Sequence, residues 1–141
     1  MNGAHERLGG CLCGALRYRT VGAPHSVGYC HCRMCQRASG APVVNWATFP
    51  ADSMTVVRGK LREFTSSPGV RRGFCQRCGS PLTFRYRSAG GAWVDVTVGS
   101  FDDPAELAPQ YHVWADSRLA WLAIADNLPR HAGNGPDLTP E

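Results

Sequence analysis

The chain has 141 residues, of which 43% are hydrophobic and 18% are charged, and its formal net charge at pH 7 is +4. This composition fits one ordinary globular domain and excludes an intrinsically disordered chain. No apolar run approaches the ~20 residues that cross a bilayer, and the first residues lack the apolar core of a signal peptide. We therefore expect a cytoplasmic protein with no membrane partner.

Basic residues are concentrated in the middle of the chain. Between Ser53 and Val94 there are eight basic residues against the single acid Glu63, whereas eight acids stand against two arginines from Asp95 onward. Two complementary surfaces of one fold would explain this pattern, and a basic surface for a small anionic ligand is the alternative. Nucleic acid is disfavoured, because no aromatic-interleaved basic motif or basic tail is present.

Short segments of alternating apolar and polar residues predict a mainly β fold with very little helix. In chain order, we expect strands at residues 16–19, 43–49, 54–57, 61–65, 82–87 and 93–98. The period of two predicts one face on a core and one face toward solvent. Helix is limited to residues 36–39 and a short segment at 104–107. We expect a single zinc-binding domain over residues 1–130, and a flexible tail over the Gly/Pro-rich, acidic residues 131–141.

The seven cysteines fall into three tight clusters. Disulfides are rare in a reducing compartment, and seven cysteines cannot all pair within one chain. Free cysteines that pack as small apolar residues are the alternative, but packing alone would not cluster them. The clustering predicts metal binding by three groups of cysteines: Cys11 with Cys13, Cys30 with Cys32 and Cys35, and Cys75 with Cys78.

The Cys-x-x-Cys-Gly sequence at Cys75–Gly79 is typical of a metal-binding knuckle. Such a knuckle supplies two thiolates, whereas tetrahedral zinc takes four ligands at about 2.3 Å. Cys11 and Cys13 are the natural partners, because flanking glycines permit a tight bend there. We expect a closed structural site that joins the first strand to the middle of the chain. A thioredoxin-like redox motif is disfavoured in β surroundings, and rubredoxin-like iron remains an alternative metal.

The central cluster supplies three thiols within six residues. Cys30, Cys32 and Cys35 leave a tetrahedral ion one ligand short, which is typical of a site with an exchangeable position. We therefore predict a second zinc ion whose open position takes a thiol substrate as thiolate. His31 lies between two ligands, so its side chain should point away. A fourth ligand from His25 or His112, or one mixed cluster with fewer metals, are the alternatives.

Three ordered motifs carry a resemblance to a known family. They are Gly-Gly-Cys-x-Cys-Gly-Ala-x-Arg-Tyr at 9–18, Cys-His-Cys-x-x-Cys-x-x-x-Ser-Gly at 30–40 and Phe-Cys-x-x-Cys-Gly-Ser-Pro-Leu at 74–82. Pro109-x-x-His112-x-Trp114 and Trp121 follow. The sequence resembles the glutathione-dependent formaldehyde-activating enzyme family, which also includes centromere protein V.

The resemblance implies an Mss4-like fold of small antiparallel sheets assembled around zinc. It implies one structural zinc at the positions of Cys11, Cys13, Cys75 and Cys78. It also implies a second zinc, where glutathione is handled, at Cys30, Cys32 and Cys35. The implied activity is the addition of glutathione to formaldehyde, a carbon-sulfur lyase reaction that gives S-hydroxymethylglutathione. The chain is shorter than the founding enzyme is expected to be, so segments that clasp the tripeptide could be missing.

Other residues receive predicted roles around the second zinc. His31 and His112 are candidate proton carriers, because imidazole titrates near neutrality. The cations expected to hold glutathione carboxylates are Arg33 and Arg37, which are near in sequence, and Arg71, Arg72 or Arg77. Trp114 and Trp121 are expected in the core. Two other functions remain open, namely a non-catalytic scaffold with two structural zincs and a thiol redox sensor.

Overall fold

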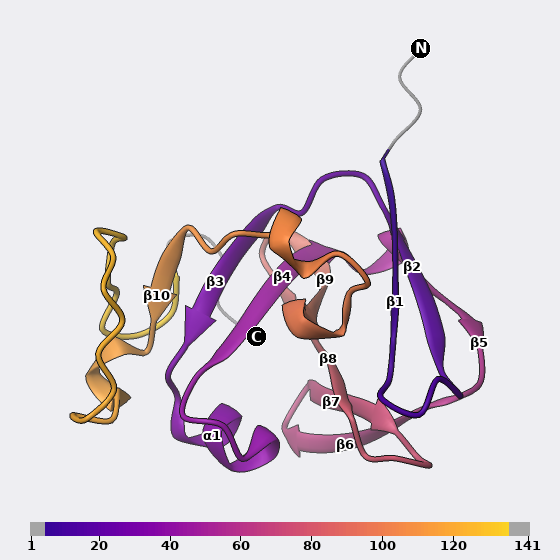
Figure 1. The fold of residues 1–141 in the computed structure, drawn as a ribbon, viewed down its shortest axis with the longest axis horizontal. Coiled ribbons are helices and arrows are strands. Elements are labelled where there is room, and N and C mark those ends of the chain that lie inside the picture. Colours follow the sequence, from indigo (N-terminus) through magenta and orange to yellow (C-terminus); the bar gives the residue numbers. More distant parts are fainter. Residues whose placement is uncertain (1–4, 136–141) are drawn as a thin grey trace.

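The structure is a computed structural model that describes residues 5–135, and this part of the chain folds into two β-sheets and one α-helix (Figure 1). The smaller sheet has the order β1-β2-β5, and the larger one has the order β10-β3-β4-β9-β8-β7-β6. The strands are β1 (Glu6–Gly10), β2 (Arg17–Val21), β3 (Ser26–Cys30), β4 (Val44–Pro50), β5 (Met54–Arg58), β6 (Leu61–Ser67), β7 (Val70–Cys75), β8 (Pro81–Ser88), β9 (Gly91–Thr97) and β10 (Tyr111–Val113). The predicted mainly β fold class is confirmed.

Neighbouring strands pair antiparallel with one exception. The short strand β10 runs parallel to β3, so that His112 lies beside Tyr29 at the edge of the larger sheet. Helix α1 (Arg33–Ser39) follows β3 and includes the predicted segment 36–39. Short 3-10 turns complete the helical structure of the described residues, at Ala51–Ser53, Val98–Ser100, Pro104–Glu106 and Ala115–Ser117. No helix in this part of the chain has the length and apolarity that a membrane span requires.

The core lies between the two sheets. Tyr18 of β2 is fully buried, donates to or accepts from the Ser100 hydroxyl at 2.6 Å, and packs edge-on against Phe101. From the larger sheet, Phe49 and Val94 are also fully buried in this cluster. These side chains meet in the core because every second side chain of a strand points to the same face of its sheet. Burial of such large apolar side chains contributes about 1.5–3 kcal/mol each.

The opposite face of the larger sheet carries polar and aromatic residues. Asp95 lies between the buried Val94 and Val96, so its side chain points away from the core. The strand register aligns five residues across this face in the order Ser26, Thr48, Asp95, Phe84 and Arg72. The face predicted to meet solvent therefore forms a wall of the functional site.

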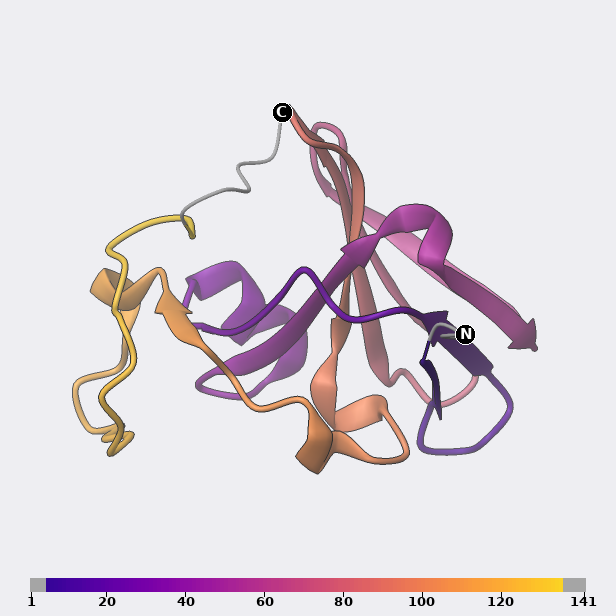
Figure 2. The ribbon, with the colours of Figure 1, turned by 90° about the horizontal axis from the view of Figure 1, so that it is seen from above.

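The segment after β10 lies beside β10, at the end of the molecule opposite the smaller sheet (Figures 1 and 2). Backbone hydrogen bonds join its two sides, because Trp114 donates to Gly133 at 2.8 Å and His131 donates to His112 at 2.9 Å. These contacts involve the first residues of the predicted tail, and residues 136–141 lie outside the described part. The boundary between a domain over 1–130 and a flexible tail stays a prediction.

Candidate metal centres and cavity

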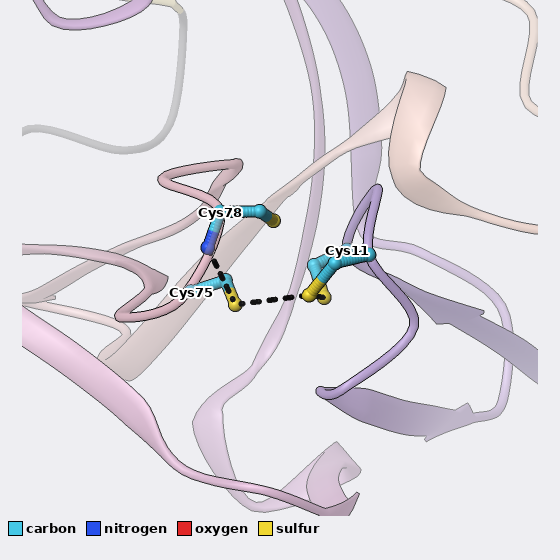
Figure 3. Close-up of side chains that lie close together, drawn as sticks. Cys11, Cys75 and Cys78 are labelled. Carbon is cyan, nitrogen blue, oxygen red and sulfur yellow. Dashed lines mark hydrogen bonds between the residues drawn. The ribbon is translucent and has the colours of Figure 1, made fainter.

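The first cysteine group joins the two sheets. The sulfurs of Cys11, Cys13, Cys75 and Cys78 all lie within 4.8 Å of one another. The Cys11 and Cys13 sulfurs are 3.6 Å apart, and those of Cys13 and Cys75 are 3.9 Å apart. Zinc–sulfur bonds of about 2.3 Å in a tetrahedron place sulfurs about 3.8 Å apart. The four thiols therefore fit one tetrahedral ion, and their side chains converge from two loops (Figure 3).

Each loop of this group is shaped by hydrogen bonds to its cysteines. The backbone N–H groups of Arg77 and Cys78 both donate to the Cys75 sulfur at 3.4 Å. Gly79 closes the turn with φ +79°, a conformation that disfavours residues with a Cβ. The Ser80 hydroxyl contacts the Cys78 sulfur at 3.1 Å, and this contact is the main reason that the pKa of Cys78 falls to about 5. The loop thus favours the thiolate form that a metal requires.

The second cysteine group is built on one short stretch of chain. Cys30 ends β3, Cys32 caps the N-terminus of α1, and Cys35 lies in its first turn. The Cys35 N–H donates to the Cys32 sulfur at 3.2 Å, and the Cys30 and Cys35 sulfurs are 3.4 Å apart. All three sulfurs lie within 4.8 Å of one another. A helix cap therefore brings three thiols to one point.

The close approach of the three thiols in this trio favours a bound cation. Hydrogen bonds from Cys30 and Cys35 lower the pKa of Cys32, whereas the contacts with Cys32 and Cys35, together with burial, raise the pKa of Cys30. Arg72 lies 3.6 Å from the Cys35 sulfur, and its charge helps to lower the pKa of Cys32. Thiols this close cannot all ionise without a compensating charge. The donor set therefore fits a thiophilic metal ion.

The trio opens onto a cavity of about 600 Å³. This volume is typical of small-molecule binding sites, which span about 300–1,000 Å³. Helix α1 contributes Arg33 and Met34 to the lining. The sheet contributes aromatic residues and the polar row described above, and the segment after β10 closes one side with Trp114. The four cysteines of the first group do not line the cavity.

No described histidine or carboxylate completes the trio. Among residues 5–135, the metal-competent groups contain cysteines alone. His112 is engaged through both ring nitrogens, because Nε2 lies 2.9 Å from Asp126 and Nδ1 lies 2.8 Å from His31. His25 lines the cavity, and its ring centroid lies 5.0 Å from that of Trp93 in a tilted arrangement. The described residues therefore leave a fourth position for a ligand from outside the chain.

His31 belongs to a buried chain of hydrogen bonds rather than to the cavity. His112 Nε2 faces the Asp126 carboxylate and His112 Nδ1 faces His31 Nε2, so in the tautomer in which His112 donates to Asp126, its Nδ1 accepts from His31. Both imidazoles are nearly inaccessible, and burial lowers the pKa of His31. The His31 side chain points away from its cysteine neighbours, as the spacing predicts. It anchors the Cys30–Cys32 loop to the segment after β10.

The predicted arginines lie in different places. Arg72 and Arg33 line the cavity, whereas Arg37 is exposed on α1 outside it. Arg71 points to the other side of β7 and lies 3.7 Å from Glu63. Arg77 is exposed in the cysteine knuckle, also outside the cavity.

Two tryptophans differ from the prediction that they would lie in the core. Trp114 is 38% exposed and Trp121 is 73% exposed. Trp114 lies in a left-handed turn with φ +53°, and its indole N–H donates to Asn134 at 3.0 Å. The sequence favours burial of large aromatic residues, but the segment after β10 packs on the sheet edge and leaves one surface free. Trp114 thereby becomes a wall of the cavity.

Asp95 is the residue of the cavity that sequence reasoning did not identify. Its Oδ1 accepts from the Thr48 hydroxyl at 2.7 Å and from the Tyr86 hydroxyl at 3.4 Å. Burial raises the pKa of Asp95 to about 7. The available signal was a single acid within the apolar alternation of β9, which also describes an ordinary solvent-facing residue.

Comparison with known proteins identifies the family of this chain. Residues 6–117 match the sequence model described as "Glutathione-dependent formaldehyde-activating enzyme". The chain belongs to this family. A relative from Halomonas elongata, provisionally named a glutathione-dependent formaldehyde-activating enzyme, is 31% identical over 127 residues, which cover 82% of this chain and 79% of the relative. The family match extends from β1 to the turn after β10, so it contains both cysteine groups.

A solved structure shows the same fold. The crystal structure of a Rhodobacter sphaeroides protein superposes with a TM-score of 0.57 at 20% identity, and the match covers 87% of this chain and 98% of that chain. The formaldehyde-activating family member described here therefore shares its overall architecture with an experimentally determined protein.

Proposed function

We propose that this chain is a cytoplasmic zinc enzyme of the carbon-sulfur lyase class, which adds a thiol to formaldehyde or another small aldehyde. Glutathione is the default thiol, as in the name of the family. In the reaction the thiol sulfur forms a bond to the carbonyl carbon, and the thiol proton ends on the carbonyl oxygen. No bond to the protein is formed, so the residues act by binding, orienting and charge stabilisation.

One observation carries the proposal: only one of the two cysteine groups opens onto the cavity. In the first group, four sulfurs surround a single point, so a bound ion has no free position. In the second group, three sulfurs lie at the wall of a space large enough for a thiol and an aldehyde. This difference separates a structural site from a reactive site within one chain.

We assign one zinc ion to each cysteine group. Cys11, Cys13, Cys75 and Cys78 would hold the structural ion, and Cys30, Cys32 and Cys35 would hold the second. A zinc ion at the second site would lower the pKa of a thiol that completes its coordination and so supply a thiolate at neutral pH. This chemistry requires cysteines that remain fixed while the ligand exchanges, and the α1 cap holds Cys32 and Cys35 in place.

Other residues of the chain would stabilise charge and hold the thiol substrate during the reaction. Arg72 places a positive charge beside Cys35 and supports the negative charge that a fourth thiolate adds. Arg33, at the rim, is the proposed partner of a glutathione carboxylate, and Arg37, which lies outside the cavity, stays a prediction for the same role. The aromatic walls would lower the local dielectric constant for a bound thiol, which strengthens its interaction with charged groups. The His31 chain orients the ligand loop, and its predicted role as a proton carrier is left to experiment.

Exchange NMR tests the reaction. Glutathione and formaldehyde also combine without an enzyme, and the zinc-loaded protein should accelerate their exchange above this background. We expect Cys32→Ser to return the rate to the uncatalysed value, because it removes a metal ligand without emptying the cavity. Equal rates for the wild type and this variant would reject the enzymatic function for this pair of substrates.

Cobalt substitution separates the enzyme from a scaffold. In cobalt-loaded protein, added glutathione should change the thiolate-to-metal and d–d absorption bands, because a new sulfur ligand enters the second site. An unchanged spectrum would favour a scaffold with two closed sites. A thiol redox sensor, in contrast, would release zinc on mild oxidation and form a reversible disulfide within the trio.

A further inference from the structure

The cavity contains a partly buried acid, Asp95, that forms no ion pair with any described residue. Asp95 lines the cavity, and among residues 5–135 no lysine, arginine or histidine forms an ion pair with it. Its Oδ1 takes both available hydroxyls, from Thr48 and Tyr86, whereas no described residue donates to Oδ2. Buried carboxylates are nearly always paired or hydrogen-bonded, because an isolated charge in apolar surroundings is costly. A carboxylate with one free oxygen facing a ligand cavity is therefore fitted to a cationic ligand.

The position of Asp95 relative to the cysteine trio sets the size of that ligand. Cys30 is opposite Val44 in the strand register, and Asp95 is opposite Thr48 on the same strand β4. Four residues of β-strand separate these points, which corresponds to about 13 Å. The side chains of Cys30 and Asp95 shorten the gap when both project into the cavity. In glutathione, eight bonds separate the sulfur of the central residue from the γ-glutamyl amino nitrogen, a reach of about 10 Å when extended, whereas only three bonds separate the two atoms in free cysteine.

The surroundings of Asp95 also favour an ammonium group over a second carboxylate. Phe84 lies next to Asp95 in the cross-strand register, and Tyr86 donates to it. Aromatic faces attract cations. Arg72 is held at the other end of the row, above the Phe84 ring and beside the Cys35 sulfur, so it does not neutralise Asp95 by an ion pair. The cavity thus offers a cation near the thiol-binding end and an anion further along the sheet.

We infer that Asp95 binds the ammonium group of the thiol cosubstrate and so selects thiols that carry a primary amine about 10 Å from the sulfur. This inference rests on the proposed function, because it requires the thiol to enter at Cys30, Cys32 and Cys35. It goes further by naming the recognition residue and the required chemistry. Glutathione, through its γ-glutamyl amino group, meets the requirement, whereas free cysteine and deaminated glutathione do not.

Binding of two matched thiols to the zinc-loaded protein provides the test. We would measure the Kd of glutathione and of glutaryl-cysteinyl-glycine, which lacks only the amino group, by calorimetry without aldehyde. The wild type should bind glutathione about 10- to 100-fold more tightly, as expected for a hydrogen bond between charged groups. Asp95→Asn keeps an oxygen for Thr48 and Tyr86, and it should reduce this preference to within about threefold by weakening glutathione alone.

Control variants and outcomes make the result decisive. Asp52→Asn removes an exposed acid outside the cavity and should keep the wild-type preference. Equal affinities of the wild type for both thiols would overturn the inference, and so would equal losses for both thiols in Asp95→Asn. If aldehyde exchange is accelerated but the preference is absent, the inference fails and the proposed function stands. If the preference is present without any exchange activity, the proposed function fails and the inference stands.

Discussion

At the scale of single residues, Asp95 links the stability of the protein to pH. Its pKa in the folded protein is about 7, compared with about 3.9 in an unfolded chain. Below pH 4 both states are protonated, so this group has no effect. Between pH 4 and 7 the unfolded state loses its proton first, and the folded state is progressively destabilised by up to about 4 kcal/mol.

We therefore expect Asp95→Asn to become more stabilising, relative to the wild type, as pH rises from 4 to 7 and to level off above pH 7. Urea unfolding of the zinc-loaded proteins at a series of pH values measures the difference. A difference that does not change with pH would contradict the raised pKa.

The buried histidine chain gives a second prediction at this scale. Asp126→Ala removes the carboxylate that His112 Nε2 contacts, and also the hydrogen bonds that Arg130 and the Leu128 N–H donate to Asp126. The variant should unfold at lower urea concentration, because a buried N–H group is left unpaired. Asp116→Ala, at an exposed acid in the same segment, is the control and should leave the midpoint unchanged. A similar shift for both variants would mean that the histidine chain does not stabilise the fold.

At the scale of elements, the knuckle between β7 and β8 depends on the backbone of one residue. Gly79 has φ +79°, and a Cβ there would meet no atom within 4 Å, so the cost of Gly79→Ala comes from the backbone alone. We expect a loss of about 1–2 kcal/mol in unfolding free energy and weaker metal binding by the first cysteine group. Gly99→Ala is the matched control, since its Cβ also meets nothing and its φ is not left-handed. Equal losses of unfolding free energy for the two substitutions would contradict backbone strain at residue 79.

Strand β7 presents two neighbouring arginines on opposite faces. Arg72 contacts Cys35 and Phe84, whereas Arg71 pairs with Glu63 at the surface. Arg72→Ala should weaken glutathione binding about tenfold, because it removes the cation beside the thiolates, while Arg71→Ala should change it less than about twofold. Titration of glutathione into the cobalt-loaded variants measures both. Similar glutathione affinities for the two variants would show that Arg72 does not contribute to thiol binding.

Prediction from sequence worked where the signal was local. The knuckle at Cys75–Gly79 and the three thiols from Cys30 to Cys35 are recognisable because few residues separate them. Strands β8 and β9 alternate clearly, so both were predicted. Strand β1 contains two glycines, and β10 has three residues paired in parallel with β3, so neither has a pattern of its own. Such strands depend on partners far away in the chain.

The cavity was beyond sequence reasoning for the same reason. The alternation of β9 correctly puts Asp95 on the face opposite the core, but it does not say what covers that face. The cover comes from the segment that includes Trp114, which was expected in the core. Its position follows from the parallel β10 pairing and from the hydrogen bonds of residues 131–134.

At the scale of the whole molecule, the two cysteine groups should contribute differently. Cys75→Ser opens the connection between the two sheets and should cost several kcal/mol of unfolding free energy, because metal binding at a structural site is part of folding. Cys32→Ser should keep the fold and lose thiol binding. Metal analysis should show about one zinc ion fewer in each variant. Comparable destabilisation of the two variants would contradict the division into a structural and a reactive site.

The spacing of the first cysteine group has a consequence for how the protein is made. Cys13 and Cys75 are separated by 62 residues in the chain, so at about 5–20 residues per second the ribosome needs several seconds to deliver the second pair after the first. The trio from Cys30 to Cys35, in contrast, leaves the exit tunnel almost at once as a complete unit. Under the proposed assignment of one ion to each group, the reactive site would therefore be complete for metal binding several seconds before the structural one.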